Sequence, residues 1–168
     1  GVQKERTISD AFEQSSSGET LVNLMDLEML VGSGGILSHA PRRNQAARML
    51  IDAFLPEGIT QLAVDSIFMM PQLGILSALH STAAIEVFEK DCLIRLGTCI
   101  APVGPQKPEN PVLTYECILP NEKLKGTLMS GELKVIPVSY DTVEVKLIPA
   151  KGIDVGAGKN EMNSTQVY

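Results

Sequence analysis

The sequence predicts an α/β part followed by a small, mostly antiparallel β module, and three observations support this fold class. A glycine turn at residues 31–35, with the sequence VGSGG, joins a short apolar run to an amphipathic helical pattern. Further apolar segments of strand and helix character follow it, as in a βαβα unit whose sheet is covered by helices. After a proline-rich stretch the pattern changes to alternation with a period of two, which is typical of half-buried strands.

The first part, residues 1–103, contains one very regular helix. Ala46, Leu50 and Phe54 recur at helical spacing within residues 41–55, with Pro41 in the first turn. Residues 67–79 are almost wholly apolar, so we expect a helix that is packed on both sides. In chain order we expect a short helix at 7–12, extended segments at 21–24 and 27–31, the helix at 41–55, a strand at 59–64, helices at 67–79 and 82–90, and a strand at 93–100.

The proline-rich segment 104–111 is interpreted as a linker or an extended crossing segment, because prolines disfavour regular structure. A β module is predicted at 112–160. Its expected strands lie at 112–119, 131–138 and 142–149, the last with Val143, Val145 and Leu147 on one face. Residues 161–168 are polar and are predicted to be a frayed tail.

Composition excludes several classes of function. The formal net charge of −6 argues against a nucleic-acid partner, and the absence of Trp removes the usual platforms for stacking bases. No apolar run has the length of a transmembrane helix, so we expect no membrane partner and a cytoplasmic location. The three cysteines show no CxxC spacing and are interpreted as buried free thiols, and the two histidines have no partners at metal-ligand spacing.

Only the glycine turn carries a clear chemical indication. Glycines allow positive φ and let the backbone approach a flat or anionic ligand, but the same turn is often a plain strand-to-helix connection. Arg42 and Arg43 oppose the dipole of the helix they begin, which favours a nearby anion or an interface; the alternative is a solvated face. Asp65 is interpreted as a helix cap, with a site carboxylate as the alternative. Residues 156–160 lack the spacing and the hydroxyl of a phosphate loop.

Four segments, taken together in order and spacing, resemble the C-terminal part of the glutamate mutase accessory protein family. They are VGSGGILS at 31–38, LAVD at 62–65, MMPQLGIL at 69–76 and AAIEVF at 83–88. Segments 131–138 and 149–158 resemble the extra β module of the longer members. The family is unrelated to the mismatch-repair protein of similar name, and it belongs to the superfamily of actin, sugar kinases and heat-shock chaperone ATPases.

The resemblance implies half of an actin-like, ribonuclease H-like ATPase lobe plus the β module. It also implies an ATP-dependent reactivating chaperone for an adenosylcobalamin-dependent mutase, with Gly32, Ser33, Gly34 and Gly35 on the adenosine of Mg-ATP. The Asp-x-Gly-x-Thr/Ser turn and the carboxylates that serve phosphate and metal in this superfamily do not appear before residue 31. We therefore expect a C-terminal fragment that is not catalytic alone, with no catalytic or metal-binding residues of its own. Self-association into a homo-oligomer is an open alternative.

Two other functions compete with this interpretation. The chain could be a non-enzymatic interaction module whose glycine turn is purely structural, as its acidic balance and lack of a catalytic set favour. It could also be a small hydrolase or transferase that uses Ser33 or a cysteine, although no G-x-S-x-G nucleophile elbow occurs.

Overall fold

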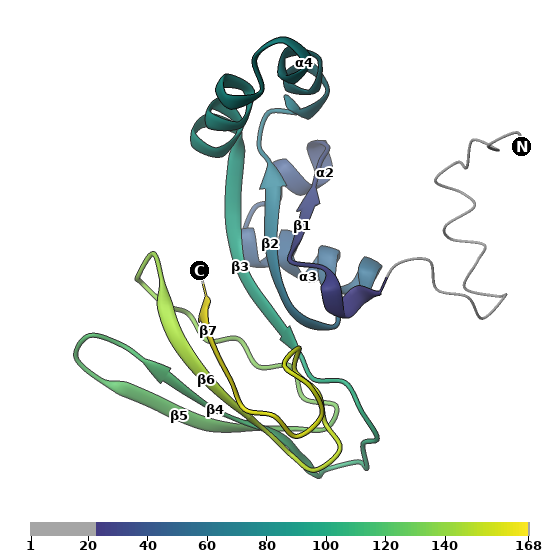
Figure 1. The fold of residues 1–168 in the computed structure, drawn as a ribbon, viewed down its shortest axis with the longest axis vertical. Helices are drawn as coiled ribbons and strands as arrows, with labels where there is room; N and C mark the ends of the chain where they lie inside the picture. The colour runs from purple at the N-terminus through teal and green to yellow at the C-terminus, as the bar shows by residue number, and fades with distance from the viewer. Residues whose placement is uncertain (1–22, 168) are drawn as a thin grey trace, which may run out of the picture.

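The computed structural model describes residues 23–167 and contains two sheets arranged end to end, joined by one long strand, β3 (Figure 1). The first part holds β1 (Met29–Gly32), β2 (Gly58–Asp65) and β3 (Leu93–Ala101), with a 3-10 helix at Leu24–Asp26, helices α2 (Gly35–Ser38), α3 (Arg43–Phe54) and α4 (Met70–Val87), and a π-helical turn at Phe88–Cys92. The second part holds β4 (Pro111–Ile118), β5 (Lys123–Met129), β6 (Val143–Pro149) and β7 (Asn163–Val167).

The first sheet has the order β1-β2-β3, with β2 parallel to β1 and antiparallel to β3. The predicted helix at 41–55 and the strand at 59–64 are confirmed as α3 and β2. Ala46 and Leu50 of α3 pack against Leu62 and Val64 of β2, which gives this part its main core. Helix α3 therefore covers one face of the sheet, and β1 ends at the glycine turn.

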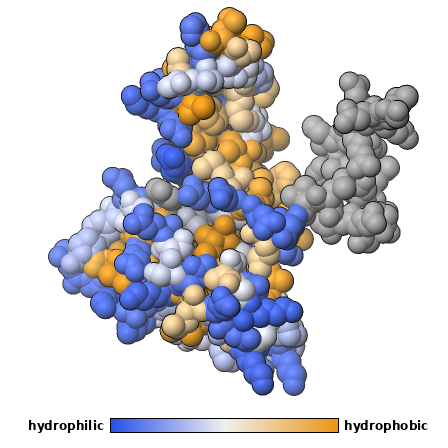
Figure 2. Space-filling view, in the orientation of Figure 1, coloured by the Kyte–Doolittle hydropathy of each residue, from blue (hydrophilic) through white to orange (hydrophobic). Residues whose placement is uncertain are grey.

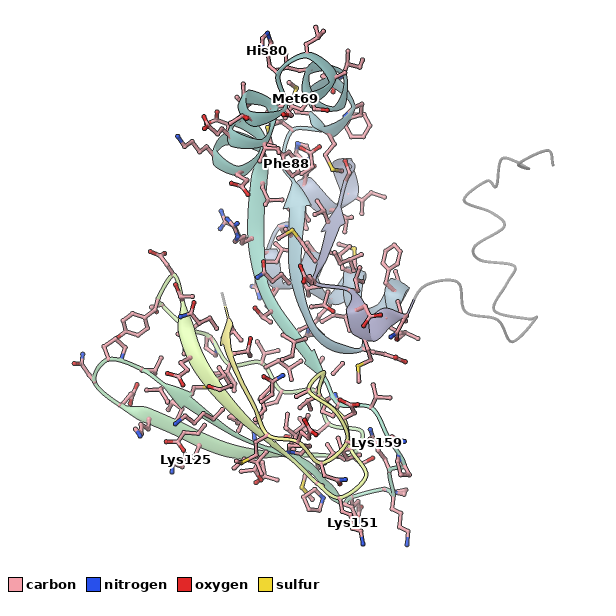
Figure 3. All side chains as sticks on the ribbon, viewed as in Figure 1. Met69, His80, Phe88, Lys125, Lys151 and Lys159 are labelled. Carbon is pink, nitrogen blue, oxygen red and sulfur yellow. The ribbon has the colours of Figure 1, made fainter. Side chains whose placement is uncertain are left out.

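The expectation that residues 67–79 form a helix buried on both sides is wrong. They belong to α4, which continues to Val87 across a non-helical residue, His80, where φ is −142° and ψ is 74°. Leu73 and Ala84 are buried and form a small core with Cys92. The half-buried Met69 and Phe88 pack against this core (Figure 3). The other apolar side chains face outward at the end of the molecule, which Figure 2 shows as an orange region; the most exposed are Ile75 and Leu79.

The second sheet is wholly antiparallel, in the order β5-β4-β6-β7. Its side chains alternate as predicted for 142–149, with Val143, Val145 and Leu147 buried. The opposite face is polar, and Glu116 bridges Lys123 and Lys125 there, at 3.2 Å from each. These two lysines donate hydrogen bonds that hold the pKa of the Glu116 carboxyl below its usual value.

Two strand predictions in this module are corrected. Residues 131–138 are not a strand but an extended crossing segment, in which Ile136 and Val138 pack onto the apolar face of the sheet. The strand in this region is instead β5, which pairs with β4, ends at Met129, before this segment begins, and contains no proline. The frayed tail is also wrong for residues 163–167, because β7 pairs with β6 and buries Val167.

The proline-rich segment 104–111 is an extended crossing segment that is hydrogen-bonded to the β module. Val103 exchanges two backbone hydrogen bonds with Asp154, at 2.9 and 2.8 Å. Ser130 donates its amide to the Asn110 carbonyl and its hydroxyl to Gln106. Residues 21–24 are predicted to be extended, but their described part leads into the 3-10 helix that begins at Leu24. The helix predicted at 7–12 lies outside the described residues.

Tyr115 and Gly126 face each other across β4 and β5, and a Cβ on Gly126 would collide with the Tyr115 ring. We therefore expect Gly126→Val to lower the free energy of unfolding by about 2 kcal/mol, because the ring must move off the sheet. Urea denaturation measures this. Thr127→Val, on the exposed face of the same strand, should change the value by less than about 0.5 kcal/mol; equal losses would contradict the role of the ring.

Candidate functional site

The glycine turn lies at the carboxyl end of β1, beside the end of β2. Gly32 is in register with Val64, so Asp65 stands at the same edge of the sheet as Ser33 and Gly34. The chain then enters the short helix α2, and α3 follows. The structure therefore brings two sequence-predicted features, the turn and Asp65, to one edge of the sheet.

Two of the three glycines of the turn are required by the fold, each for a different reason, and the third is not. A Cβ on Gly32 would lie 2.6 Å from Leu37 and 2.9 Å from Leu50, so packing of the helices on β1 excludes a side chain there. Gly34 has φ 109° and ψ 158°, a conformation open in practice to glycine alone. Gly35 has neither constraint: its φ is not positive, and a Cβ would meet only His39, at 4.0 Å.

The side chains near the turn are arranged around its backbone. Ser38 donates its hydroxyl to the Gly34 carbonyl at 3.1 Å, and its oxygen lies 3.0 Å from Nδ1 of His39. That nitrogen is also 3.1 Å from the Gly35 carbonyl. Neither Ser38 nor His39 is predicted from the sequence to be part of the site. One signal is present: Ser38 lies four residues after Gly34, the spacing at which a helical serine reaches a backbone carbonyl.

The hydroxyl of Ser33 is buried and has no hydrogen-bond partner among the described residues. Buried polar atoms are nearly always paired, so this oxygen needs an explanation. A partner supplied from outside the described residues would satisfy it. As a nucleophile Ser33 has no support, because neither histidine is recorded as its hydrogen-bond partner and its oxygen is enclosed.

Asp65 is fully buried and acts as the predicted cap. Its carboxylate accepts hydrogen bonds from the amide of Ile67 at 3.3 Å and from the amide of Met70 at 3.0 Å. Both oxygens are thereby used to hold the entry to α4. The interpretation as a helix cap is confirmed, although the residue borders the glycine turn.

Arg42 and Arg43 are exposed at the start of α3, and neither forms an ion pair within the part of the chain that the structure describes. The local stabilisation comes from Gln45 instead: its side chain accepts the Arg42 amide at 3.2 Å, and its own amide donates to the Arg42 carbonyl at 3.0 Å. Contact of these arginines with an anion stays a prediction.

Residues 156–160 form a turn held by their own side chains. Asp154 accepts the amides of Gly156 at 2.8 Å and Gly158 at 3.1 Å, and Asn160 accepts the amide of Gly152 at 2.5 Å. The glycine amides that a phosphate loop would offer to a ligand are therefore occupied. This agrees with the rejection of a phosphate loop on spacing.

The cysteines are free, as predicted: Cys92 and Cys117 are buried and Cys99 is half-buried. Burial raises the pKa of all three thiols, and Asp65 and Asp91 raise the pKa of Cys92 further. A raised pKa leaves little thiolate at neutral pH, so the arrangement does not favour thiol catalysis. Within residues 23–167 no group of three or more His, Cys, Asp or Glu side chains could hold a metal ion.

Fold and site together define a mixed α/β protein with an attached antiparallel module, whose open glycine turn lies at the carboxyl edge of its first sheet. The sequence model of the family described as "MutL protein" matches residues 4–92, just over half of the chain, and the chain therefore belongs to that family. The match covers most of the α/β part and none of the second sheet. Searches of curated proteins and of solved structures gave no significant match. No helix among the described residues has the length and apolar character of a membrane span.

Removal of the Asp65 carboxylate should weaken the entry to α4. We expect Asp65→Ala to lower the free energy of unfolding by about 1–2 kcal/mol, and Asp65→Asn, which keeps one acceptor oxygen, by less. Chemical denaturation followed by circular dichroism measures both. Asp52→Ala, which removes an exposed carboxylate from α3, is the control; a loss as small as that of the control would argue against the cap.

The raised pKa of Cys92 predicts a loss of stability at alkaline pH. Because the folded pKa lies above the unfolded one, the contribution of the thiol is complete below the unfolded pKa and is lost as pH rises through the folded pKa. Between about pH 7.5 and about pH 10, the free energy of unfolding should therefore fall less for Cys92→Ala than for the wild type. Leu73→Ala, in the same cluster, should leave this pH difference unchanged; an unchanged difference in Cys92→Ala would contradict the assignment.

Proposed function

We propose that this chain supplies the adenosine side of an ATP site in an ATP-dependent reactivating chaperone for an adenosylcobalamin-dependent, glutamate mutase-like enzyme. Membership of the MutL protein family supports the association with a glutamate mutase. The observation that supports the nucleotide role is the open surface at Gly34 and Gly35, where added Cβ atoms would meet little or nothing. The order of the sequence motifs, which resembles that of the glutamate mutase accessory protein family, connects the association with a mutase to the nucleotide role of the glycine turn.

The residues present fit a purine better than they fit its phosphates. A flat ring needs backbone without side chains, and Gly34 and Gly35 leave the space in front of the turn free. The hydroxyl of Ser33 lies directly before them, but it is buried, so in this conformation the backbone of the turn and not this hydroxyl faces a bound group. ATP would supply the free energy of hydrolysis that drives reactivation, while this chain would bind and orient its base.

Phosphate and metal contacts belong, in this proposal, to a second lobe. Among the described residues there is no group of three or more His, Cys, Asp or Glu side chains at metal-binding distance, and in the other glycine-rich turn, at 156–158, Asp154 occupies the amides of Gly156 and Gly158. We therefore expect this chain to bind Mg-ATP weakly when it is alone. The β module is the proposed contact for the mutase, and it leaves a polar sheet face with the Glu116–Lys123–Lys125 cluster available to a partner.

The structure also favours one alternative, a non-enzymatic interaction module with a structural turn. Gly32 and Gly34 are each required by the fold itself, through packing in one case and backbone conformation in the other. The exposed apolar surface of α4 fits an interaction role equally well. Gly35 separates the two functions, because the fold gives no reason for a glycine at that position.

Gly35→Ala should abolish binding of the nucleotide without changing stability. Millimolar Mg-ATP should shift the amide resonances of residues 32–39 in the wild-type chain, and Mg-GTP should shift them less. In Gly35→Ala these shifts should disappear, because the new methyl group occupies the approach to the purine, while the free energy of unfolding stays within about 0.5 kcal/mol of the wild type.

The matched control is Gly74→Ala, since Gly74 in α4 also has open space around it and should keep the ATP response. If wild-type resonances near the turn do not move in millimolar Mg-ATP, or if Gly35→Ala responds like the wild type, the adenosine assignment is wrong. The same variants then serve in calorimetric titrations with an adenosylcobalamin-dependent mutase, where binding that depends on neither ATP nor Gly35 would favour the interaction module.

A further inference from the structure

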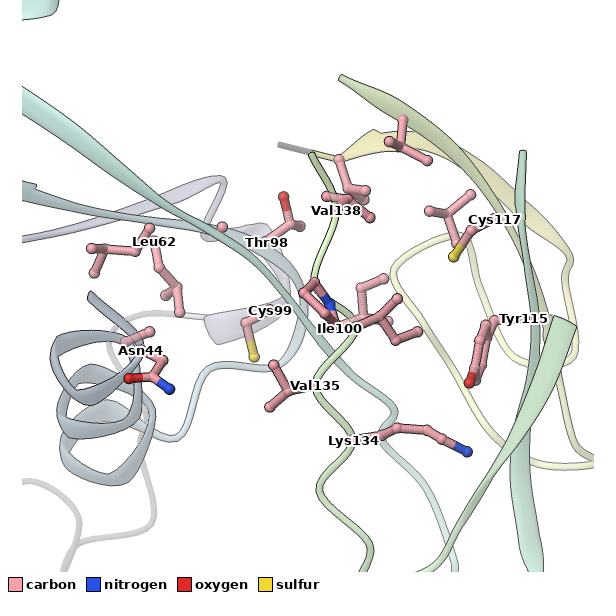
Figure 4. Close-up of a pocket in the computed structure, with 18 of the residues that line it drawn as sticks. Asn44, Leu62, Thr98, Cys99, Ile100, Tyr115, Cys117, Lys134, Val135 and Val138 are labelled. Atoms are coloured by element: carbon pink, nitrogen blue, oxygen red, sulfur yellow. The ribbon is translucent and has the colours of Figure 1, made fainter. Parts of the chain in front are cut away.

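A large cavity opens between the two parts of the molecule, away from the glycine turn. Its volume is about 610 Å³, and it is bounded by α3 and β3 on one side and by the apolar face of the second sheet on the other (Figure 4). The crossing segment 133–140 forms a third wall. A cavity of this size between two units is within the usual range for a site that binds a small molecule.

The interior of the cavity is mostly apolar. Cys99 and Ile100 line it from the first sheet, Tyr115 from the second and Val135 from the crossing segment, while Val145 and Leu147 of the second sheet are almost wholly buried in the adjoining core. Cys99 points toward Val135, and Tyr115 lies on the far side next to Lys134 (Figure 4). A ligand would therefore bury an apolar body here, and each buried methylene group would contribute about 0.8 kcal/mol.

The charged groups of the cavity are of one sign. Arg48 from α3, Arg95 from β3 and Lys134 from the crossing segment line it, and no Asp or Glu occurs among its described lining residues. This is unexpected in a chain of net charge −6, in which acidic residues outnumber basic ones. A cavity lined by a single sign of charge attracts the opposite sign and repels its own.

Lys134 is held in position at the edge of the cavity. Its ammonium lies 5.7 Å from the centre of the Tyr115 ring, 3.4 Å from the Thr127 carbonyl and 3.9 Å from Glu132. The crossing segment forms no strand with the sheets, so its place is fixed by side chains such as Lys134 and Ile136. The cation is thus presented to the cavity by packing rather than by a flexible loop.

We propose that this cavity is a binding site for a small organic anion with an apolar body, of the class of medium-chain fatty carboxylates. The apolar body lies between α3 and β3 on one side and the crossing segment with Tyr115 on the other. The carboxylate lies toward Arg48 and Lys134. Because the walls come from both parts of the molecule, occupancy fixes one part against the other, and it does not involve the glycine turn.

The test uses decanoate and decylammonium, two probes with the same apolar chain and opposite charge, in calorimetric titrations of the full chain. Decanoate should bind at least about tenfold more tightly than decylammonium. Arg48→Gln should weaken decanoate binding about threefold, the effect of one exposed ion pair, whereas Arg43→Gln, on the same helix outside the cavity, should not change it. Val135→Trp should fill the cavity and block decanoate binding. Because Val135 lies outside the strands, this substitution does not disturb strand pairing.

The place of binding is read from the cysteines. Cys99 lines the cavity and Cys92 does not, so decanoate should slow alkylation of Cys99 and leave Cys92 unaffected in a mass-spectrometric footprint. Equal affinity for the two probes, equal losses in Arg48→Gln and Arg43→Gln, or unchanged alkylation of Cys99 would overturn the proposal.

Discussion

The close contact between Gly32 and the helices above it is the constraint on which the first part of the structure depends. Because Gly32 has no side chain, Leu37 and Leu50 reach the backbone of β1, and α3 packs directly on the sheet. This packing fixes where β1 ends and forces the chain to turn at Gly34, in a conformation reserved for glycine. The position of the turn at this edge, with a Ser33 hydroxyl that has no partner among the described residues, is consistent with this contact.

The second part of the molecule packs against the first through the end of β3 and the beginning of β2, which pair with each other. Ile59 and Ile100 stand opposite each other where β2 meets β3, and both pack against the core of the antiparallel sheet. The two sheets therefore share apolar contacts at this end. Farther along, the gap between them is bridged by the crossing segment, and the cavity with its basic edge lies there.

The two candidate sites, the glycine turn and the cavity, are supported by different kinds of observation. At the glycine turn, Gly35 is a glycine that the fold does not require, and the Ser33 hydroxyl has no partner among the described residues. At the cavity, it rests on an apolar volume whose charged lining has one sign. The apolar surface of α4 is a third feature, and it shows that apolar residues alone do not determine burial.

The sequence by itself determined the local elements and the chemistry of the turn. Periodicity located α3 and β2, the alternation at 142–149 located β6, and glycine and aspartate identified the turn and the cap, because these signals act within one or two turns of chain. Tertiary structure decided what neighbouring elements do to a segment. Residues 131–138 pattern like a strand but cross the apolar face of the sheet, where Ile136 and Val138 pack, while the polar residues 163–167 pair with β6. The helix α4, apolar enough for a core, remains uncovered because no described element packs over it. Burial and pairing depend on contacts between distant residues, which no local pattern contains.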